Sequence, residues 1–184
     1  MNYTTKIIKE SMPVLLLASI ITSIGGIALQ SIQQHLITFL PFLIMLPALN
    51  ALVGDFGIIL VSKLTTYLYA HKKNLQGEKH YVHHLLRDVI IAASFTTCYI
   101  VLLSLVLATL QGFSFNADFV IKMVIITALV IAIMLLITGA IACFFSLYAW
   151  KHHEDPDDVL LPITTSIADL GSMIALSILI NIFF

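Results

Sequence analysis

Apolar and polar positions divide the chain into five long apolar runs separated by short polar segments. A helix that crosses a bilayer needs roughly 20 predominantly apolar residues, and each run has about that length or more. The pattern predicts an all-α transmembrane fold, a polytopic five-helix bundle in which residues 1–184 form a single transmembrane domain. The expected spans are 12–29, 36–70, 89–110, 119–148 and 159–183.

The second apolar run, 36–70, is longer than a bilayer requires. We expect this helix to be long and kinked or broken, because proline removes a helical hydrogen bond and glycine weakens a helix. The expected irregularities are at Pro41, Pro47, Gly54 and Gly57. The fourth run is predicted to be broken in character near Gly139. Broken helices leave carbonyl groups free, and transporters use such groups to hold ions.

The composition is that of a membrane protein, with 60% hydrophobic residues, 10% charged residues and a mean hydropathy of +1.04. A soluble domain of this size has no means of hiding so much apolar surface, so we expect a multi-pass protein of the cell membrane, surrounded by lipid. No pattern indicates nucleic-acid binding. Cys98 and Cys143 lie in apolar runs, where we interpret them as small buried residues rather than a disulfide or a metal pair.

Basic residues between the apolar runs indicate the orientation. They lie before the first span, between the second and third, and between the fourth and fifth: Lys6, Lys9, Lys72, Lys73, Lys79, Arg87 and Lys151. Cytoplasmic loops carry an excess of Lys and Arg, so the N-terminus is predicted to be cytoplasmic and the C-terminus outside. Residues 71–88 are the longest predicted polar loop. On the other side, Asp118 and Lys122 have the i,i+4 spacing of a helical ion pair.

Asp169 is the leading candidate for a functional residue. It lies near the middle of the fifth run, where a charge costs about 2.5–3.5 kcal/mol on insertion scales and should face protein, water or an ion. Thr165, Ser172 and Met173 share its helical face. A carboxylate beside hydroxyls offers hard oxygen ligands that suit Mg²⁺ or Ca²⁺. Two other interpretations fit the sequence, an ion pair with Lys63 and a proton relay.

Asp55 is a second acid inside an apolar run, and it lies between Gly54 and Gly57. Glycine beside a buried acid indicates close approach of another helix or an ion. Alternatively, the acid sits at a packing kink and reaches a water-filled cavity. Lys63 follows two helical turns later on nearly the same face. It either holds an acid by charge or extends to the cytoplasmic interface, which is the more ordinary behaviour of lysine.

Histidines gather on the predicted cytoplasmic side: His71, His80, His83, His84, His152 and His153. On a helix the HxxHH spacing brings imidazoles together, and imidazole suits Zn²⁺, Ni²⁺ or Co²⁺. A solvated His-rich loop is the commoner explanation. No metalloprotease motif, nucleophile elbow or glycine-rich phosphate loop is visible, so no enzyme activity is expected.

Two stretches, PALNALVGDFGIILVSKLTT and DPDDVLLPITTSIADLGSM, resemble the signatures of a transporter family. This is the MgtE-type and solute-carrier magnesium transporter family, in a short, single-repeat, archaeal-like form without cytoplasmic sensing domains. The first signature reads approximately P-x-L-x-x-L-x-G-N-L-x-x-x-L-x-S-R-L-x-T, and the second D-P-D-x-x-x-x-P-x-x-x-x-x-x-D. The matching residues are Pro47, Leu49, Leu52, Gly54, Leu60, Ser62, Leu64, Thr66, Asp155, Pro156, Asp157, Pro162, Thr165 and Asp169.

The resemblance implies a homodimer with an ion pore along the dimer axis. It implies that Asp169 of each subunit holds hydrated Mg²⁺, and that Asp155 lies at the cytoplasmic end of the same helix. Asp155 is also explained as a helix cap, because a proline and two more acids follow it. Two positions depart from the family pattern. Asp55 replaces the usual Asn, which gives a dimer four buried carboxylates rather than two, and Lys63 replaces an Arg, which removes any bidentate clamp.

We therefore expect a divalent cation transporter or channel, Mg²⁺ first, that works as a homodimer and holds the ion with Asp169, Asp55, Thr165 and Asp155. Mg²⁺ dehydrates reluctantly, so a polar pore with few carboxylates recognises the hydrated ion. One alternative is a transition-metal or Ca²⁺ carrier on the same scaffold, which the histidines and Asp55 favour. The other is a non-transporting membrane subunit in which Asp55, Lys63 and Asp169 form a structural charge network.

Overall fold

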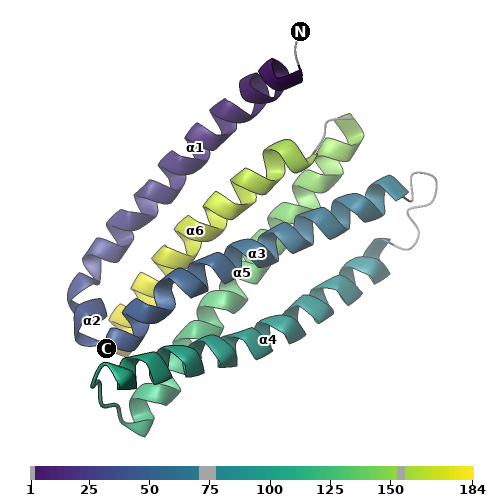
Figure 1. The fold of residues 1–184 in the computed structure, drawn as a ribbon. Coiled ribbons are helices and arrows are strands. Elements are labelled where there is room, and N and C mark those ends of the chain that lie inside the picture. The colour runs from purple at the N-terminus through teal and green to yellow at the C-terminus, as the bar shows by residue number, and fades with distance from the viewer. Residues whose placement is uncertain (1–2, 71–77, 153–155) are drawn as a thin grey trace.

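The computed structural model describes the backbone of residues 3–70, 78–152 and 156–184, and the side chains of residues 12–70, 80–144 and 161–184. Within these ranges every regular element is a helix, as Figure 1 shows. The helices are α1 (Tyr3–Ser31), α2 (Gln33–Thr38), α3 (Leu40–Ala70), α4 (Glu78–Leu110), α5 (Ala117–His152) and α6 (Pro156–Phe183). The predicted all-α fold is confirmed.

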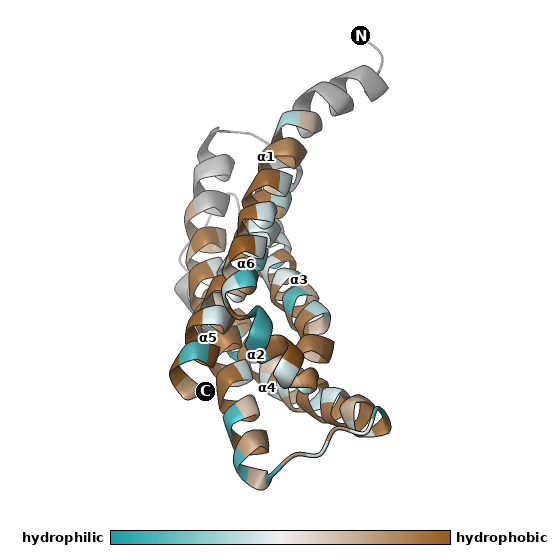
Figure 2. Cartoon of the chain, turned by 90° about the vertical axis from the view of Figure 1, so that its left-hand side faces the viewer, coloured by the Kyte–Doolittle hydropathy of each residue, from teal (hydrophilic) through white to brown (hydrophobic). Residues whose placement is uncertain are grey.

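Five of the helices are long and apolar enough to cross a membrane, whereas α2 has only six residues. The apolar segments are Met12–Ser31, Leu40–Ala70, His80–Leu110, Ala117–Phe144 and Leu161–Phe183. Hydrophobic residues cover most of their length in Figure 2, whereas α2 begins with three hydrophilic residues. Large apolar side chains such as Phe95 and Leu136 are 75% and 76% exposed, as suits helices whose solvent is hydrocarbon. The chain is a multi-pass membrane protein.

Helix α3 lies at the centre of the bundle and packs against α4, α5 and α6, while α1 packs along α6. The side chains that α3 buries completely or nearly so include Phe42, Met45 and Leu49. Helices α1 and α6 run in the same direction, and α3 and α5 run antiparallel to them (Figure 1). As a result, the three segments that carry the predicted cytoplasmic charges adjoin the same end of the bundle. Which end faces the cytoplasm stays a prediction.

The long second run is broken once, at Phe39, between α2 and α3. Phe39 leaves the helical region with φ −108° and ψ 76°. Pro41 follows in the first turn of α3, where its missing N–H forfeits no helical bond. Helix α3 then continues through Pro47, Gly54 and Gly57. The predicted break near Pro41 is therefore confirmed, whereas Pro47, Gly54 and Gly57 do not break the helix, because packing against three neighbouring helices outweighs the local weakness. A kink at these three positions stays a prediction.

Two further features of the helices differ from the sequence prediction: the continuity of α5 and the start of α4. Helix α5 passes through Gly139 without a break, because that glycine packs against Leu86 of α4; a Cβ added there would lie 3.5 Å from the Leu86 Cδ2. The predicted loop 71–88 is partly helical, since α4 already begins at Glu78. At the opposite end of the bundle the predicted ion pair is confirmed, with 3.0 Å between the Lys122 ammonium and the Asp118 carboxylate.

Candidate ion site

Asp169 lies in the middle of α6, as the fourteenth of its 28 residues, and its side chain is half-buried. Two helices reach it from opposite sides. The amide nitrogen of Asn50 in α3 donates to Asp169 Oδ1 at 2.9 Å, and the hydroxyl of Thr22 in α1 lies 3.4 Å from Oδ2. The carboxylate therefore faces the side of α6 that lies between α1 and α3.

Asn50 is held in one orientation by its two neighbours on α6. Its Oδ1 accepts a hydrogen bond from the Ser172 hydroxyl, which also lies 2.9 Å from the Asp169 carbonyl oxygen. A flipped amide would point Oδ1 at the Asp169 carboxylate, and two acceptors facing each other repel. Asn50 thus presents its N–H donor to the Asp169 carboxylate and its amide oxygen to the Ser172 hydroxyl.

The partners of Asp169 are all electrically neutral. Among the residues with described side chains, ion pairs form only between Arg87 and Asp88 and between Lys122 and Asp118. Lys63 is exposed and pairs with neither Asp55 nor Asp169. The interpretation of Asp169 as a partner of Lys63 was therefore wrong. Hydrogen bonds from an amide and a hydroxyl fill part of the acceptor capacity of a carboxylate, but they do not neutralise its charge.

Asp55 lies outside this network, although it occupies the middle of α3 as the sixteenth of 31 residues. It follows Asn50 by five residues, which is about 7.5 Å along a helix axis. Its side chain is exposed and has no hydrogen bond or ion pair to the part of the chain that the structure describes. An exposed carboxylate halfway along a spanning helix is out of place against lipid, so its surroundings must come from water, an ion or another chain.

The glycines beside Asp55 bring α3 close to α6, as expected from the sequence. A Cβ added at Gly57 would lie 3.0 Å from the Thr164 methyl carbon, and one at Gly54 would lie 4.0 Å from that of Thr165. Thr165 turns its hydroxyl to the carbonyl oxygens of Leu161 and Pro162, both at 3.0 Å. It therefore lies one turn from Asp169, at the level of Gly54, without touching the carboxylate.

Several candidates of the sequence analysis do not enter this network. Asp155 lies outside the described residues, as do the side chains of Asp157 and Asp158. Three of the candidate histidines, His80, His83 and His84, lie in the first turns of α4, at the end of the bundle where α3 ends, whereas both acids lie near the middle of their helices. In the described part of the molecule, no three His, Cys, Asp or Glu side chains gather as a metal site would require. One chain thus contributes a single carboxylate at the level of Asp169.

Sequence reasoning missed Asn50 and Thr22, the two residues that hold the Asp169 carboxylate. The candidates of the sequence were the charges within the apolar runs, and neither Asn50 nor Thr22 carries a charge. An uncharged amide within an apolar run was the available signal for Asn50, because such a group needs a partner inside the membrane.

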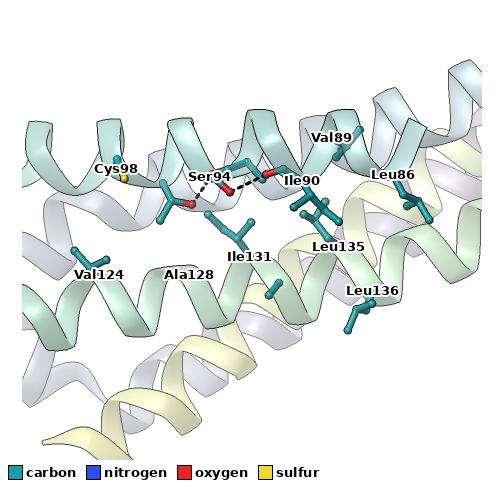
Figure 3. Close-up of a pocket in the computed structure, with 13 residues that line it drawn as sticks. Leu86, Val89, Ile90, Ser94, Cys98, Val124, Ala128, Ile131, Leu135 and Leu136 are labelled. Carbon is teal, nitrogen blue, oxygen red and sulfur yellow. Dashed lines mark hydrogen bonds between the residues drawn. The ribbon is translucent and has the colours of Figure 1, made fainter. Parts of the chain in front are cut away.

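A cavity of about 510 Å³ opens between α4 and α5, away from these residues. Figure 3 shows aliphatic side chains from both helices along it. Its few polar groups are engaged within α4: Ser94 donates to the Ile90 carbonyl at 2.9 Å, and Thr97 to the Ala93 carbonyl at 2.6 Å. Such a lining suits hydrocarbon and offers an ion nothing, so the candidate ion site remains at Asp169.

Comparison with known families gives a match over most of the chain. The family described as MgtE, a divalent cation transporter, matches residues 46–179, which include Asn50, Asp55 and Asp169. Comparison with curated proteins and with solved structures finds no significant match. The matched segment covers well over half of the chain and contains most of α3, all of α4 and α5, and most of α6. The chain therefore belongs to the MgtE family of divalent cation transporters.

Proposed function

We propose that this chain carries Mg²⁺ across the membrane as a homodimer, with Asp169 of each copy holding the hydrated ion. The observation that carries the proposal is the mid-membrane carboxylate of Asp169, which has neutral partners only: Asn50 and Thr22. A charge at that depth costs about 2.5–3.5 kcal/mol on insertion scales when nothing compensates it. A passing cation supplies the compensation that the described part of the chain does not.

The chemistry of the site favours Mg²⁺. The carboxylate, the hydroxyls and the amide are oxygen and nitrogen groups of a hard site, and no thiol or imidazole lies in the network. Mg²⁺ keeps several of its waters, so one or two carboxylates suffice to recognise it. Asn50 and Thr22 leave lone pairs of Asp169 free for those waters, because each donates one hydrogen bond.

Asp55 supports the homodimer. It is exposed at the middle of α3 without a partner in the described part of the chain, and lipid is an unfavourable neighbour for a carboxylate. A second copy facing this side of α3 would enclose a polar path with Asp55 and Asp169 of both subunits. Thr165 would line the path one turn from Asp169, and Asp155 would lie at its cytoplasmic end. The proposal treats residues 1–184 as one transmembrane domain of the cell membrane with a cytoplasmic N-terminus.

The alternatives differ in the ion or in the role of the charges. Asp55 adds a carboxylate where the family pattern has Asn, and this observation favours a Ca²⁺ or transition-metal carrier as second candidate. A structural charge network finds less support, because Lys63 pairs with neither acid.

Ion flux into liposomes that hold the purified protein and an internal Mg²⁺-sensitive dye tests the proposal. Wild type should admit Mg²⁺, and Asp169→Asn, which keeps the size and removes the charge, should not. Asp88→Asn is the matched control, because Asp88 is an exposed acid of α4 paired with Arg87. Equal Mg²⁺ flux through wild type and Asp169→Asn would show that Asp169 is structural. Flux of Ca²⁺, Co²⁺ or Zn²⁺ without Mg²⁺ would establish the second candidate instead.

A further inference from the structure

Two imidazoles face each other at the start of α4. His80 and His84 are four residues apart, on one face of the helix. Their Nε2 atoms lie 2.9 Å apart, and the ring centroids are 4.3 Å apart with planes at 83°. His80 is exposed and His84 is half-buried, so ions in solution have access to the pair.

The spacing of the two nitrogens fits metal chelation. Two imidazole nitrogens bound to one ion at about 2.05 Å lie about 2.9 Å apart when they subtend 90°, and about 3.3 Å apart in a tetrahedral site. The observed separation of 2.9 Å equals the value for a 90° angle at the ion. Neighbouring ligands in square-planar or octahedral coordination have this angle. Cu²⁺ and Ni²⁺ prefer such sites with nitrogen ligands, and Mg²⁺ prefers oxygen ligands.

The metal-free pair needs little rearrangement to accept an ion. One Nε2 donates its hydrogen to the other in the hydrogen bond between His80 and His84. When that proton moves through water to the Nδ1 of the same ring, both Nε2 atoms carry a free lone pair, and rotation of the two rings about their side-chain torsions turns these lone pairs toward a common ion. No proton is gained or lost in this tautomer change. The remaining coordination positions face solvent and are filled by water.

The helix that carries the pair is held in place. Tyr81, the residue after His80, stacks on Tyr67 of α3 with ring centroids 4.0 Å apart and planes at 9°. The Tyr81 hydroxyl also donates to the Lys63 carbonyl oxygen at 3.3 Å. Arg87, one turn beyond His84, has its charge neutralised by Asp88 at 3.0 Å, so it adds little repulsion toward a bound cation.

We propose that His80 and His84 form a two-imidazole binding site for a divalent late transition metal, of the class of Ni²⁺ or Cu²⁺. The site lies at the end of the bundle where α3 ends and α4 begins (Figure 1), and it is separate from Asp169 in the middle of α6. It binds a class of ion different from the one proposed for transport, and it holds whether or not Mg²⁺ is the transported ion.

Calorimetric titration of the full-length protein in detergent with Ni²⁺, in the presence of excess Mg²⁺, tests the site. Wild type should bind Ni²⁺ that Mg²⁺ does not displace. His80→Gln and His84→Gln should each weaken that binding at least about tenfold, because each loses one arm of a chelate. The double variant, which keeps neither imidazole, should bind at least as weakly as either single variant. Nitrogen hyperfine splitting in the spectrum of bound Cu²⁺ should show two imidazoles in wild type and at most one in each single variant.

His83→Gln is the matched control, since its ring lies 6.4 Å from that of His84 and takes no part in the pair. It should bind Ni²⁺ as wild type does. Unchanged Ni²⁺ affinity in the double variant would assign the metal to other histidines and overturn the proposal, as would an equal loss in His83→Gln. Circular dichroism and elution volume establish that each variant is folded. Mg²⁺ flux should be the same in His84→Gln as in wild type.

Discussion

The amide nitrogen of Asn50 donates to the Asp169 carboxylate at 2.9 Å, across the contact between the central helix α3 and α6. This bond joins residues 119 positions apart, and it sets the direction in which the acid faces. We expect Asn50→Ala to weaken both the contact and transport. Hydrogen bonds to charged groups contribute about 1.5–3 kcal/mol, so the Mg²⁺ flux of this variant should fall roughly tenfold or more.

A double-mutant cycle separates this bond from general packing. Asn50→Ala, Asp169→Ala and the double variant should show a coupling of about 1.5–3 kcal/mol in the free energy of unfolding in mixed micelles. Asn116→Ala, in the exposed connection before α5, is the control and should be additive with Asp169→Ala. Additivity of the first pair would mean that the bond contributes nothing in the membrane.

The main elements were predictable because a spanning helix needs only length and apolarity. Asp169 was predictable for a related reason, since a charge in hydrocarbon is rare and costly. Asn50 was not predicted, because an uncharged amide in an apolar run is less costly than a charge and so less noticeable. Its partner, Asp169, also lies far along the chain, on α6. Gly139 misled the prediction of a break in the fourth run, because residue type reports local preference and not the neighbouring helices that override it.

A cysteine at position 55 should react with water-soluble thiol reagents that cannot cross lipid. Asp55 is exposed in the middle of a spanning helix, and in the proposed dimer its surroundings are a polar path. The measurement is labelling of Asp55→Cys in proteoliposomes by a charged methanethiosulfonate, in a background that lacks Cys98 and Cys143. Mg²⁺ flux should fall when the positive reagent is attached, because it places a fixed cation beside the ion path.

Phe95→Cys is a matched control for this labelling. Phe95 is the sixteenth of 31 residues in its span, as Asp55 is in its own, and it is 75% exposed. Its surroundings are expected to be lipid, so a thiol there should stay unlabelled by the charged reagent. Equal labelling at both positions, or at neither, would contradict a polar path along α3.

Gly57→Ala should destabilise the contact between α3 and α6. The added Cβ would lie 3.0 Å from the Thr164 methyl carbon and 3.7 Å from that of Thr138, and both belong to stiff β-branched side chains. Gly26→Ala is the comparison, because nothing lies within 4 Å of its added Cβ. The free energy of unfolding of Gly26→Ala should rise by up to about 1 kcal/mol, because alanine has the higher helix propensity. The midpoint of thermal unfolding in detergent should therefore be lower for Gly57→Ala than for Gly26→Ala. Equal midpoints would show that the contact between α3 and α6 accommodates the added methyl group.

Thr164→Val should stabilise the protein. The Thr164 side chain is completely buried, and its hydroxyl has no hydrogen-bond partner in the described part of the chain. An unsatisfied buried hydroxyl costs about 1–3 kcal/mol, and valine keeps the shape while removing that cost. Thr138→Val is the matched control, since its equally buried hydroxyl donates to the Met134 carbonyl at 2.7 Å. The unfolding midpoint should rise for Thr164→Val and stay level or fall for Thr138→Val; a fall for Thr164→Val would contradict an unsatisfied hydroxyl at this position.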